Sequence, residues 1–203
     1  MKKYNQIVEA YNYSELSKEA KEVAKQKYLD TYRDTDFFSE DLIQDLCEKY
    51  GLCNLKTYYS LSYCQGDGLC LEGKIDDSEI FNNPLFRKIA LKGLVGRQIQ
   101  LAEDCIAGVA FNHNGRYYYA KSTNIENVDN HYDMTDKQQK VIDKVIENIN
   151  DWYLEFCAQW EKYGYEYFYE VDDETMVDMS EANLWVYDEN GNITDVSGLE
   201  EVA

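Results

Sequence analysis

The chain has 203 residues, of which 44% are hydrophobic and 14% aromatic. This is enough apolar material for one domain with a sizeable core, and too much for a disordered chain. Its 39 Asp and Glu residues against 20 Lys and Arg residues give a formal net charge of −19. A field of this sign repels nucleic-acid phosphates and anionic lipid headgroups, so direct binding to nucleic acid or to a membrane is not expected.

The sequence predicts a protein of the cytoplasm. No stretch approaches 18 consecutive apolar residues, and the first residues lead into polar sequence without the apolar core of a signal peptide. The cysteines lie at positions 47, 53, 64, 70, 105 and 157, and none of them forms a C-x-x-C pair. We therefore expect reduced, structural thiols and neither zinc nor another cofactor. Cys64 and Cys70 flank a predicted turn, so they are the two thiols best placed to interact.

In the first 50 residues, the apolar positions have the spacing of helices. Ser17 is a suitable N-cap for a helix whose apolar stripe runs from Ala20 to Tyr28. Ser39 can cap a second helix that reaches Tyr50, where Gly51 is a natural stop. Two short helices are therefore expected before the first strand.

From residue 55 onward, the spacing of the apolar residues changes from the helical period of 3.6 residues to the strand period of 2. Residues 55–64 alternate as a half-buried strand does, residues 65–68 interrupt them, and residues 69–73 resume the alternation, which predicts a hairpin. Asn83-Pro84 predicts the start of a helix over 85–94. We read residues 99–111 as a further strand, joined by a type I′ turn at Asn114-Gly115 to a partner strand over 116–122.

The sequence next predicts a long helix. Thr135-x-x-Gln138 is a capping box, and the apolar residues behind it keep helical spacing over residues 136–163, up to Gly164. A short helix over 173–182 and two strands about Asn190-Gly191 follow. The sequence therefore predicts a single α+β domain over 1–203, with a mainly antiparallel sheet of about four to six strands covered by helices.

Charge is concentrated in an acidic C-terminal subregion over residues 164–203. After Lys162 there is no Lys or Arg but there are twelve Asp and Glu residues, so the first 162 residues carry −7 of the −19. Large amphipathic rings stand beside these carboxylates, among them Tyr165, Tyr167 and Tyr169. Carboxylates fixed on a folded surface imitate a phosphate backbone, and tyrosines are favoured interface anchors. The alternative is a solvated surface that serves solubility.

The Gln65-Gly66-Asp67-Gly68 loop is the most compact candidate for chemistry. Its glycines would let the backbone approach a partner, with Gln65 and Asp67 as fixed polar groups. The alternative is a tight turn in which Asp67 bonds its own backbone. The loop has neither the lysine of a P-loop nor a dinucleotide fingerprint. Nucleophilic catalysis would need a base, and His113 and His131 lie in no nucleophile motif.

Four segments of the chain, taken in their order, carry a resemblance to a known family. They are residues 13–21, residues 59–68 with Glu72-Gly73, residues 114–119, and residues 172–191. Together they resemble an uncharacterised family of proteins encoded by phages and prophages, with a central Gln-Gly-Asp-Gly hairpin and sometimes labelled antitoxin-like. The resemblance implies a phage context but no established activity.

Phage context and acidic charge together predict an anti-CRISPR-like inhibitor. It would act stoichiometrically, as a nucleic-acid mimic, on a host nucleic-acid-binding defence protein, with CRISPR effectors the leading target. The alternatives are a small enzyme with its pocket at the Gln65–Gly68 hairpin, or an antitoxin-like regulatory binding module. The residues expected to contact the partner are Gln65, Asp67, Tyr165, Tyr167, Tyr169, Asp172, Asp173, Glu174, Asp178 and Glu181.

Overall fold

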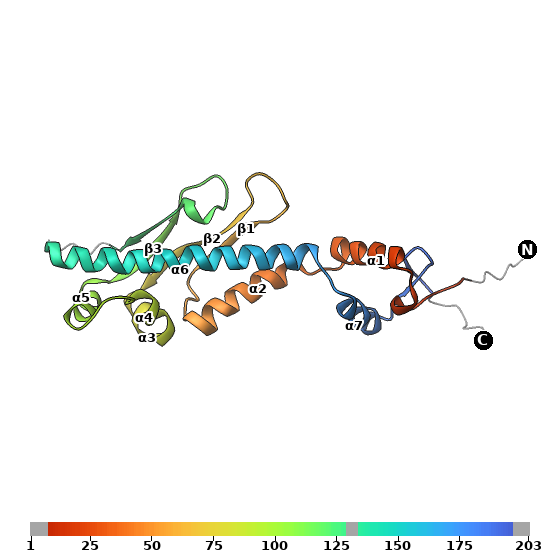
Figure 1. Cartoon of the computed structure of the whole chain (residues 1–203), viewed down its shortest axis with the longest axis horizontal. Coiled ribbons are helices and arrows are strands. Elements are labelled where there is room, and N and C mark those ends of the chain that lie inside the picture. The colour runs from red at the N-terminus through yellow and green to blue at the C-terminus, as the bar shows by residue number, and fades with distance from the viewer. Residues whose placement is uncertain (1–7, 129–133, 197–203) are drawn as a thin grey trace, which may run out of the picture. The chain divides into compact units, whose positions relative to one another are not determined.

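The computed structural model describes residues 8–128 and 134–196, and it has the predicted α+β architecture (Figure 1). Its residues form two compact units. We call residues 35–165 the sheet unit, and residues 1–34 with 166–203 the terminal unit. Among the described residues, no helix has the length and apolar character needed to cross a membrane.

The sheet unit is built on a four-stranded antiparallel sheet in the order β1-β2-β3-β4. Its strands are β1 Lys56–Ser60, β2 Gly68–Asp76, β3 Gly108–His113 and β4 Thr123–Asn127. Its helices are α2 Thr35–Asp45, followed by a π-helical turn over Leu46–Tyr50, then α3 Asp77–Asn82, α4 Pro84–Ala90, α5 Arg97–Cys105 and α6 Asp136–Tyr169, whose last four residues belong to the terminal unit.

Helix α6 lies along the sheet (Figure 1). The ring of Tyr153, fully buried on α6, packs against Phe111 of β3 with ring centroids 5.6 Å apart. The Tyr153 hydroxyl donates to Thr123 Oγ1 at 2.8 Å and accepts from the backbone N–H of Leu71 at 3.4 Å. One buried side chain therefore joins the long helix to three strands.

The terminal unit has a small core of its own. It contains the 3₁₀ turn η1 Tyr13–Glu15, α1 Lys18–Thr31, α7 Asp173–Asn183, and a two-stranded sheet of β5 Val186–Tyr187 and β6 Ile193–Thr194. Its buried core residues are Tyr13, Leu16, Ala20, Ala24, Tyr28, Met176 and Tyr187. Ala20, Ala24 and Tyr28 of the predicted α1 stripe are thus buried, whereas Val23 of the same stripe is 41% exposed. The predicted C-terminal strand pair is confirmed, and Tyr187 of β5 packs in the same core.

Several predicted caps and turns are also confirmed. Ser17 Oγ accepts from the N–H of Ala20 at 3.2 Å, and Thr135 and Gln138 bond reciprocally at the start of α6. Asn83 caps α4, and β1 pairs with β2 as the predicted hairpin. Local side-chain chemistry was sufficient to place these features.

The prediction of a strand over residues 99–111 was wrong in its first half. Residues 97–105 form α5, because the buried side chains Ala102, Cys105 and Ile106 follow helical spacing. The short helix α3 was not predicted. Asp76 caps α3 in a reciprocal capping box with Glu79, a pattern that the sequence contains.

The partner strand was predicted seven residues too early. Gly115 does not adopt the positive φ of a type I′ turn, and β4 begins at Thr123. The N–H of Asn114 donates to the carbonyl of Ser122 at 3.1 Å, and the connection between them ends in the 3₁₀ turn η3 Ala120–Ser122. This loop packs against the β1–β2 hairpin.

The helix predicted over 85–94 ends at Ala90. Two other helix boundaries differ from those predicted, both for tertiary reasons. Helix α2 begins at Thr35, and Ser39 lies inside it, where its hydroxyl donates to the Tyr59 hydroxyl at 3.0 Å. Helix α6 continues through Gly164. A Cβ at Gly164 would lie 2.3 Å from Leu61 Cδ1 and 2.8 Å from Phe38 Cζ, so glycine stands here because neighbouring side chains fill the space.

Candidate functional site

The residues expected to contact a partner are divided between the two units. Gln65, Asp67 and Tyr165 belong to the sheet unit, and the other seven to the terminal unit.

Asp67 holds the hairpin loop together from inside. Its Oδ2 accepts from the N–H of Ser62 at 2.7 Å, from the N–H of Cys64 at 3.0 Å and from the Tyr165 hydroxyl at 2.8 Å. Its Oδ1 accepts from the hydroxyl of Ser60 and that of Ser62, both at 3.3 Å. Asp67 is 9% exposed, so little of it is left for a partner.

These hydrogen bonds also fix the charge of Asp67. Desolvation raises the pKa of the carboxyl, but the bonds from Cys64, Tyr165, Ser62 and Ser60 outweigh it and lower the pKa to about 2. A carboxylate with so low a pKa accepts a proton poorly at neutral pH, which disfavours a role as general base. Asp67 therefore acts as a structural anchor for the loop.

The loop of residues 114–122 is packed against this hairpin. A Cβ at Gly66 would lie 2.4 Å from the Tyr117 ring, and a Cβ at Gly68 would lie 2.5 Å from the carbonyl oxygen of Tyr118. Both glycines are therefore needed for close approach of the two loops. Gln65 is exposed at the hairpin turn.

Exposed tyrosines surround the packed loops, and sequence reasoning missed most of them. Tyr63 is 70% exposed at a φ of 54°, and its ring stacks on Tyr165 with centroids 4.6 Å apart. The other exposed rings belong to Tyr117, Tyr118 and Tyr119. The run Arg116 to Tyr119 was the available signal, but it was assigned to a strand. Tyrosine and arginine on loops are typical of protein-binding surfaces.

A catalytic arrangement at the hairpin finds little support. His113 Nδ1 lies 3.2 Å from Thr123 Oγ1 and therefore has a structural partner. Within residues 8–128 and 134–196, no three His, Cys, Asp or Glu side chains come close enough to hold a metal ion, and the six cysteines are free thiols. His131 lies outside the described residues.

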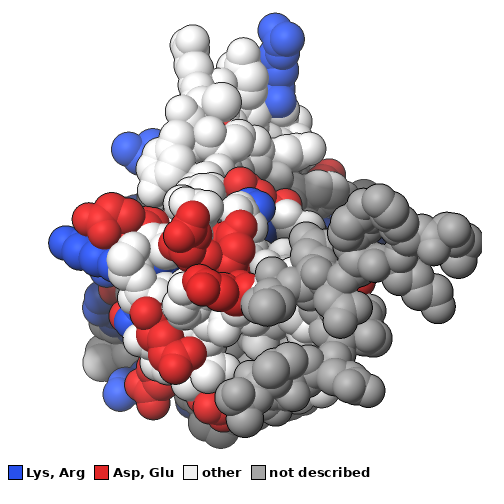
Figure 2. Space-filling model, turned by 90° about the vertical axis from the view of Figure 1, so that its right-hand side faces the viewer, with Lys and Arg blue, Asp and Glu red and all other residues white. Residues whose placement is uncertain are grey.

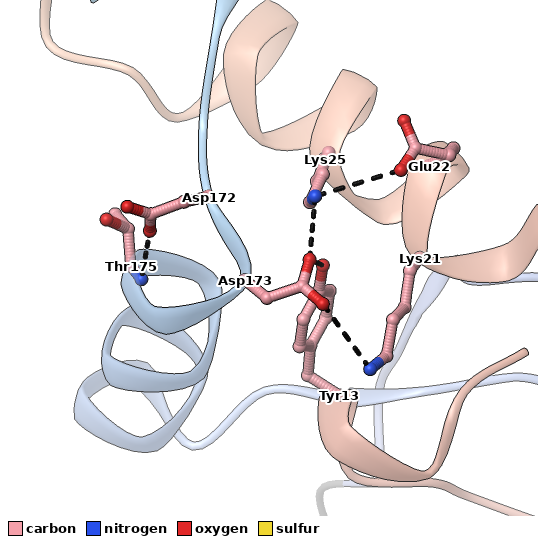
Figure 3. A network of polar contacts seen from close by, with 7 residues as sticks. All are labelled: Tyr13, Lys21, Glu22, Lys25, Asp172, Asp173 and Thr175. Atoms are coloured by element: carbon pink, nitrogen blue, oxygen red, sulfur yellow. Dashed lines mark hydrogen bonds and ion pairs between the residues drawn. The ribbon is translucent and has the colours of Figure 1, made fainter. Parts of the chain in front are cut away.

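In the terminal unit, the first carboxylates of α7 are committed to the fold (Figure 3). Asp172 is the N-cap and accepts from the N–H of Thr175 at 2.7 Å. Asp173 forms ion pairs with Lys25 at 2.6 Å and Lys21 at 3.6 Å, and it accepts from the Tyr13 hydroxyl at 3.0 Å. Hydrogen bonds from Lys25 and Tyr13 lower the pKa of Asp173. This network anchors α7 to α1.

The remaining three predicted carboxylates face solvent. Glu174, Asp178 and Glu181 are four and three residues apart on α7, so they share one side of the helix. All three are exposed, and none of their carboxylates has a hydrogen bond or ion pair within the described residues. We call these three residues the acidic stripe. Figure 2 shows a face of the molecule on which Asp and Glu side chains gather.

The two remaining tyrosines differ in their surroundings. The Tyr167 hydroxyl donates to the carbonyl of Asp34, and the guanidinium of Arg33 lies 4.7 Å from the centre of its ring. Arg33 also donates to the carbonyl of Glu170 at 2.9 Å. Tyr169 is 40% exposed. Tyr167 is therefore part of the terminal unit's internal packing, and Tyr169 is the more accessible ring.

Residues 35–173 match the family described as Domain of unknown function (DUF8835). The chain belongs to this family. The match covers the described sheet unit and the whole of α6, and it stops at the first residue of α7. The acidic stripe thus lies beyond the part shared with DUF8835. Searches of curated proteins and of solved structures found no match to the chain.

Proposed function

We propose that the protein is a phage-encoded inhibitor of a host defence system. It would act without catalysis and in a fixed ratio to its target, a nucleic-acid-binding protein, with a CRISPR effector as the favoured case. The observation that carries this proposal is the acidic stripe of Glu174, Asp178 and Glu181, which is exposed and unpaired on a helix that the rest of the unit holds in place.

The spacing of the stripe suits a site made for phosphates. At 1.5 Å per residue, its carboxylates rise along the helix axis in steps of about 5 Å. The phosphates of one nucleic-acid strand rise by about 3.4 Å, so the two charge spacings are of the same order. A groove lined with Lys and Arg would be attracted to either.

The acidic stripe differs from a flexible solubilising tail because it lies on an ordered helix. Met176 and Ser180 are buried on the other side of α7, and Asp173 pairs with two lysines of α1. The carboxylates of the stripe are therefore held on a rigid helix, so binding them costs less conformational entropy than binding a flexible acidic tail. No Lys or Arg follows Lys162 in the sequence to neutralise them.

The test removes the charge of the stripe without touching the anchor. The variant E174Q/D178N/E181Q and the control E40Q/D151N/E155Q each remove three charges, and all six positions are exposed. Binding to purified CRISPR effectors, and inhibition of their DNA binding, would be measured at 50 mM and 200 mM salt. We expect the stripe variant to bind at least about tenfold more weakly and the control to bind as the wild type does.

Two results would contradict the proposal. One is equal potency of the stripe variant while its circular dichroism spectrum is unchanged. The other is inhibition at amounts far below one protein per target, which would indicate turnover and therefore the enzyme alternative.

A second candidate function rests on the exposed tyrosines of the sheet unit. Tyr63, Tyr118 and Tyr119 favour an antitoxin-like regulatory module that binds its partner through the packed loops. This candidate predicts a tight complex with the product of a neighbouring gene. Replacing Tyr63 and Tyr119 by Ser would weaken that complex, whereas the stripe variant would leave it intact.

A further inference from the structure

A groove between α5 and α6 carries a concentration of positive charge that is unusual for this chain. Its volume is about 800 Å³, within the size range of small-molecule sites. Its lining contains four basic residues and no Asp or Glu, although acids outnumber bases about two to one in the sequence. The four basic residues are Arg97, Lys137, Lys140 and Lys144, and Leu94, Leu101 and Val141 line the groove beside them.

The basic residues stand above an apolar floor. Leu94 and Val141 are 8% and 5% exposed, and Leu101 is half-buried between them and solvent. Arg97, Lys137 and Lys140 are exposed and have no ion pair within the described residues, while Lys144 pairs with Glu147 at 2.7 Å. The groove thus offers charge at its rim and hydrocarbon at its base.

The walls of the groove are fixed. Buried Asn148 of α6 donates to the carbonyls of Ala90 and Lys92, at 2.9 and 2.8 Å, and so holds the loop that leads into α5. At the other end, Gln138 of α6 donates to Cys105 Sγ of α5 at 3.4 Å. The groove is therefore a built feature and not a gap between mobile segments.

The lysines of the rim repel one another when the groove is empty. Lys137, Lys140 and Lys144 are three and four residues apart on α6, so they are neighbours on one side of the helix, and like charges at this spacing destabilise a helix. Residues of the first turns of α5 and α6 also line the groove, and the N-terminus of a helix carries the positive end of its dipole. An anion placed there would relieve this repulsion.

We propose that this groove binds a small organic anion, with a phosphate or carboxylate on the basic rim and an aromatic or aliphatic body on Leu94, Leu101 and Val141. A long polyanion is disfavoured, because repulsion by the net charge of −19 grows with the charge of the ligand. The site lies inside the residues that match the DUF8835 family. It is independent of the acidic stripe and of the inhibitor proposal.

The test separates the charge of a ligand from its apolar body. The full-length protein is titrated with 1-naphthyl phosphate, 1-naphthoate, inorganic phosphate and 1-naphthol, and backbone amide shifts are followed by NMR. We expect at least one naphthyl anion to saturate and to shift amides of residues 93–101 and 135–144, with inorganic phosphate and naphthol at least about tenfold weaker. Whichever anion binds more tightly identifies the headgroup.

Two variants and a stability measurement complete the experiment. R97Q/K140Q should weaken binding of the naphthyl anion about tenfold, while K56Q/K121Q, which removes two exposed charges elsewhere in the sheet unit, should not. Saturating ligand should raise the melting temperature of the wild type. Absence of saturable binding, equal binding of naphthol, or equal loss in the control variant would overturn the proposal.

Discussion

The hydroxyl of Tyr165 donates a 2.8 Å hydrogen bond to Asp67, and so joins α6 to a hairpin 98 residues earlier in the chain. The same Asp67 oxygen accepts from the N–H groups of Ser62 and Cys64. One carboxylate therefore sets both the shape of the loop and its position on the helix. Burial, followed by the bond to Asp67, raises the pKa of Tyr165, so the phenol stays a donor over the physiological pH range.

Asp67→Asn should destabilise the protein in a pH-dependent way. The folded pKa of Asp67 is about 2, below its ordinary value of 3.8, so its stabilising contribution is full above about pH 4 and is lost as the pH falls through 2. We expect a lower melting temperature for the variant at pH 7, and a difference from the wild type that narrows between pH 4 and pH 2. If the difference in melting temperature did not depend on pH, the ionised carboxylate of Asp67 would not be its cause.

Tyr165→Phe tests the helix side of the same contact. It removes a hydrogen bond to a charged group, and the free energy of unfolding should fall by about 1.5–3 kcal/mol. Chemical denaturation at pH 7 measures the change. If the bond carries the effect, Tyr165→Phe in the Asp67→Asn background should cost less than it does in the wild type.

Tyr13→Phe should loosen α7. Tyr13 is 2% exposed and donates to Asp173 at 3.0 Å, so the variant loses a hydrogen bond to a carboxylate, which contributes about 1.5–3 kcal/mol. Amides of α7 should exchange with solvent deuterium faster. Tyr32→Phe is the control, because Tyr32 is 46% exposed and the change should alter stability by less than about 0.5 kcal/mol. Equal exchange rates in both variants would argue against the anchor.

Gly164→Ala should destabilise the protein, although Gly164 lies inside a helix, where alanine is normally the better residue. Helix propensity alone favours alanine by about 1 kcal/mol. However, the new Cβ would overlap Leu61 and Phe38, and such overpacking costs about 1–3 kcal/mol. Thermal unfolding should therefore show a lower melting temperature. Ala158→Gly, at an exposed site on the same helix, should cost only the propensity difference. A stabilised Gly164→Ala variant would contradict the packing.

The thiols should react in an order set by exposure. Cys53 and Cys64 are exposed, whereas Cys70 and Cys157 are fully buried, and burial raises their pKa values to about 11 and about 12. At pH 8 at most about one buried thiol in a thousand is then ionised. Iodoacetamide with mass spectrometry should label Cys53 and Cys64 first in the folded protein. Early labelling of Cys157 would show that its surroundings open.

Local patterns predicted much of the fold. The caps at Ser17 and Thr135, the β1–β2 hairpin and the long helix each depend on residues close together in the chain, so a sequence contains their signals. The α+β class followed from these elements. The strand assigned to residues 99–105 failed, since apolar residues at alternate positions and at helical positions overlapped there, and only burial against the sheet unit's core separates the two.

For the candidate sites too, some features follow from the sequence and others only from the tertiary structure. The sequence by itself determined that the chain is strongly acidic, where the acids concentrate, and that a glycine-rich hairpin precedes β2. Tertiary structure decided which carboxylates are available: Asp67 and Asp173 are bound internally, and Glu174 is free in solvent. It also brought the lysines of α6 to the loop before α5. Charge is a property of composition, but access and proximity depend on contacts between segments that are far apart in the chain.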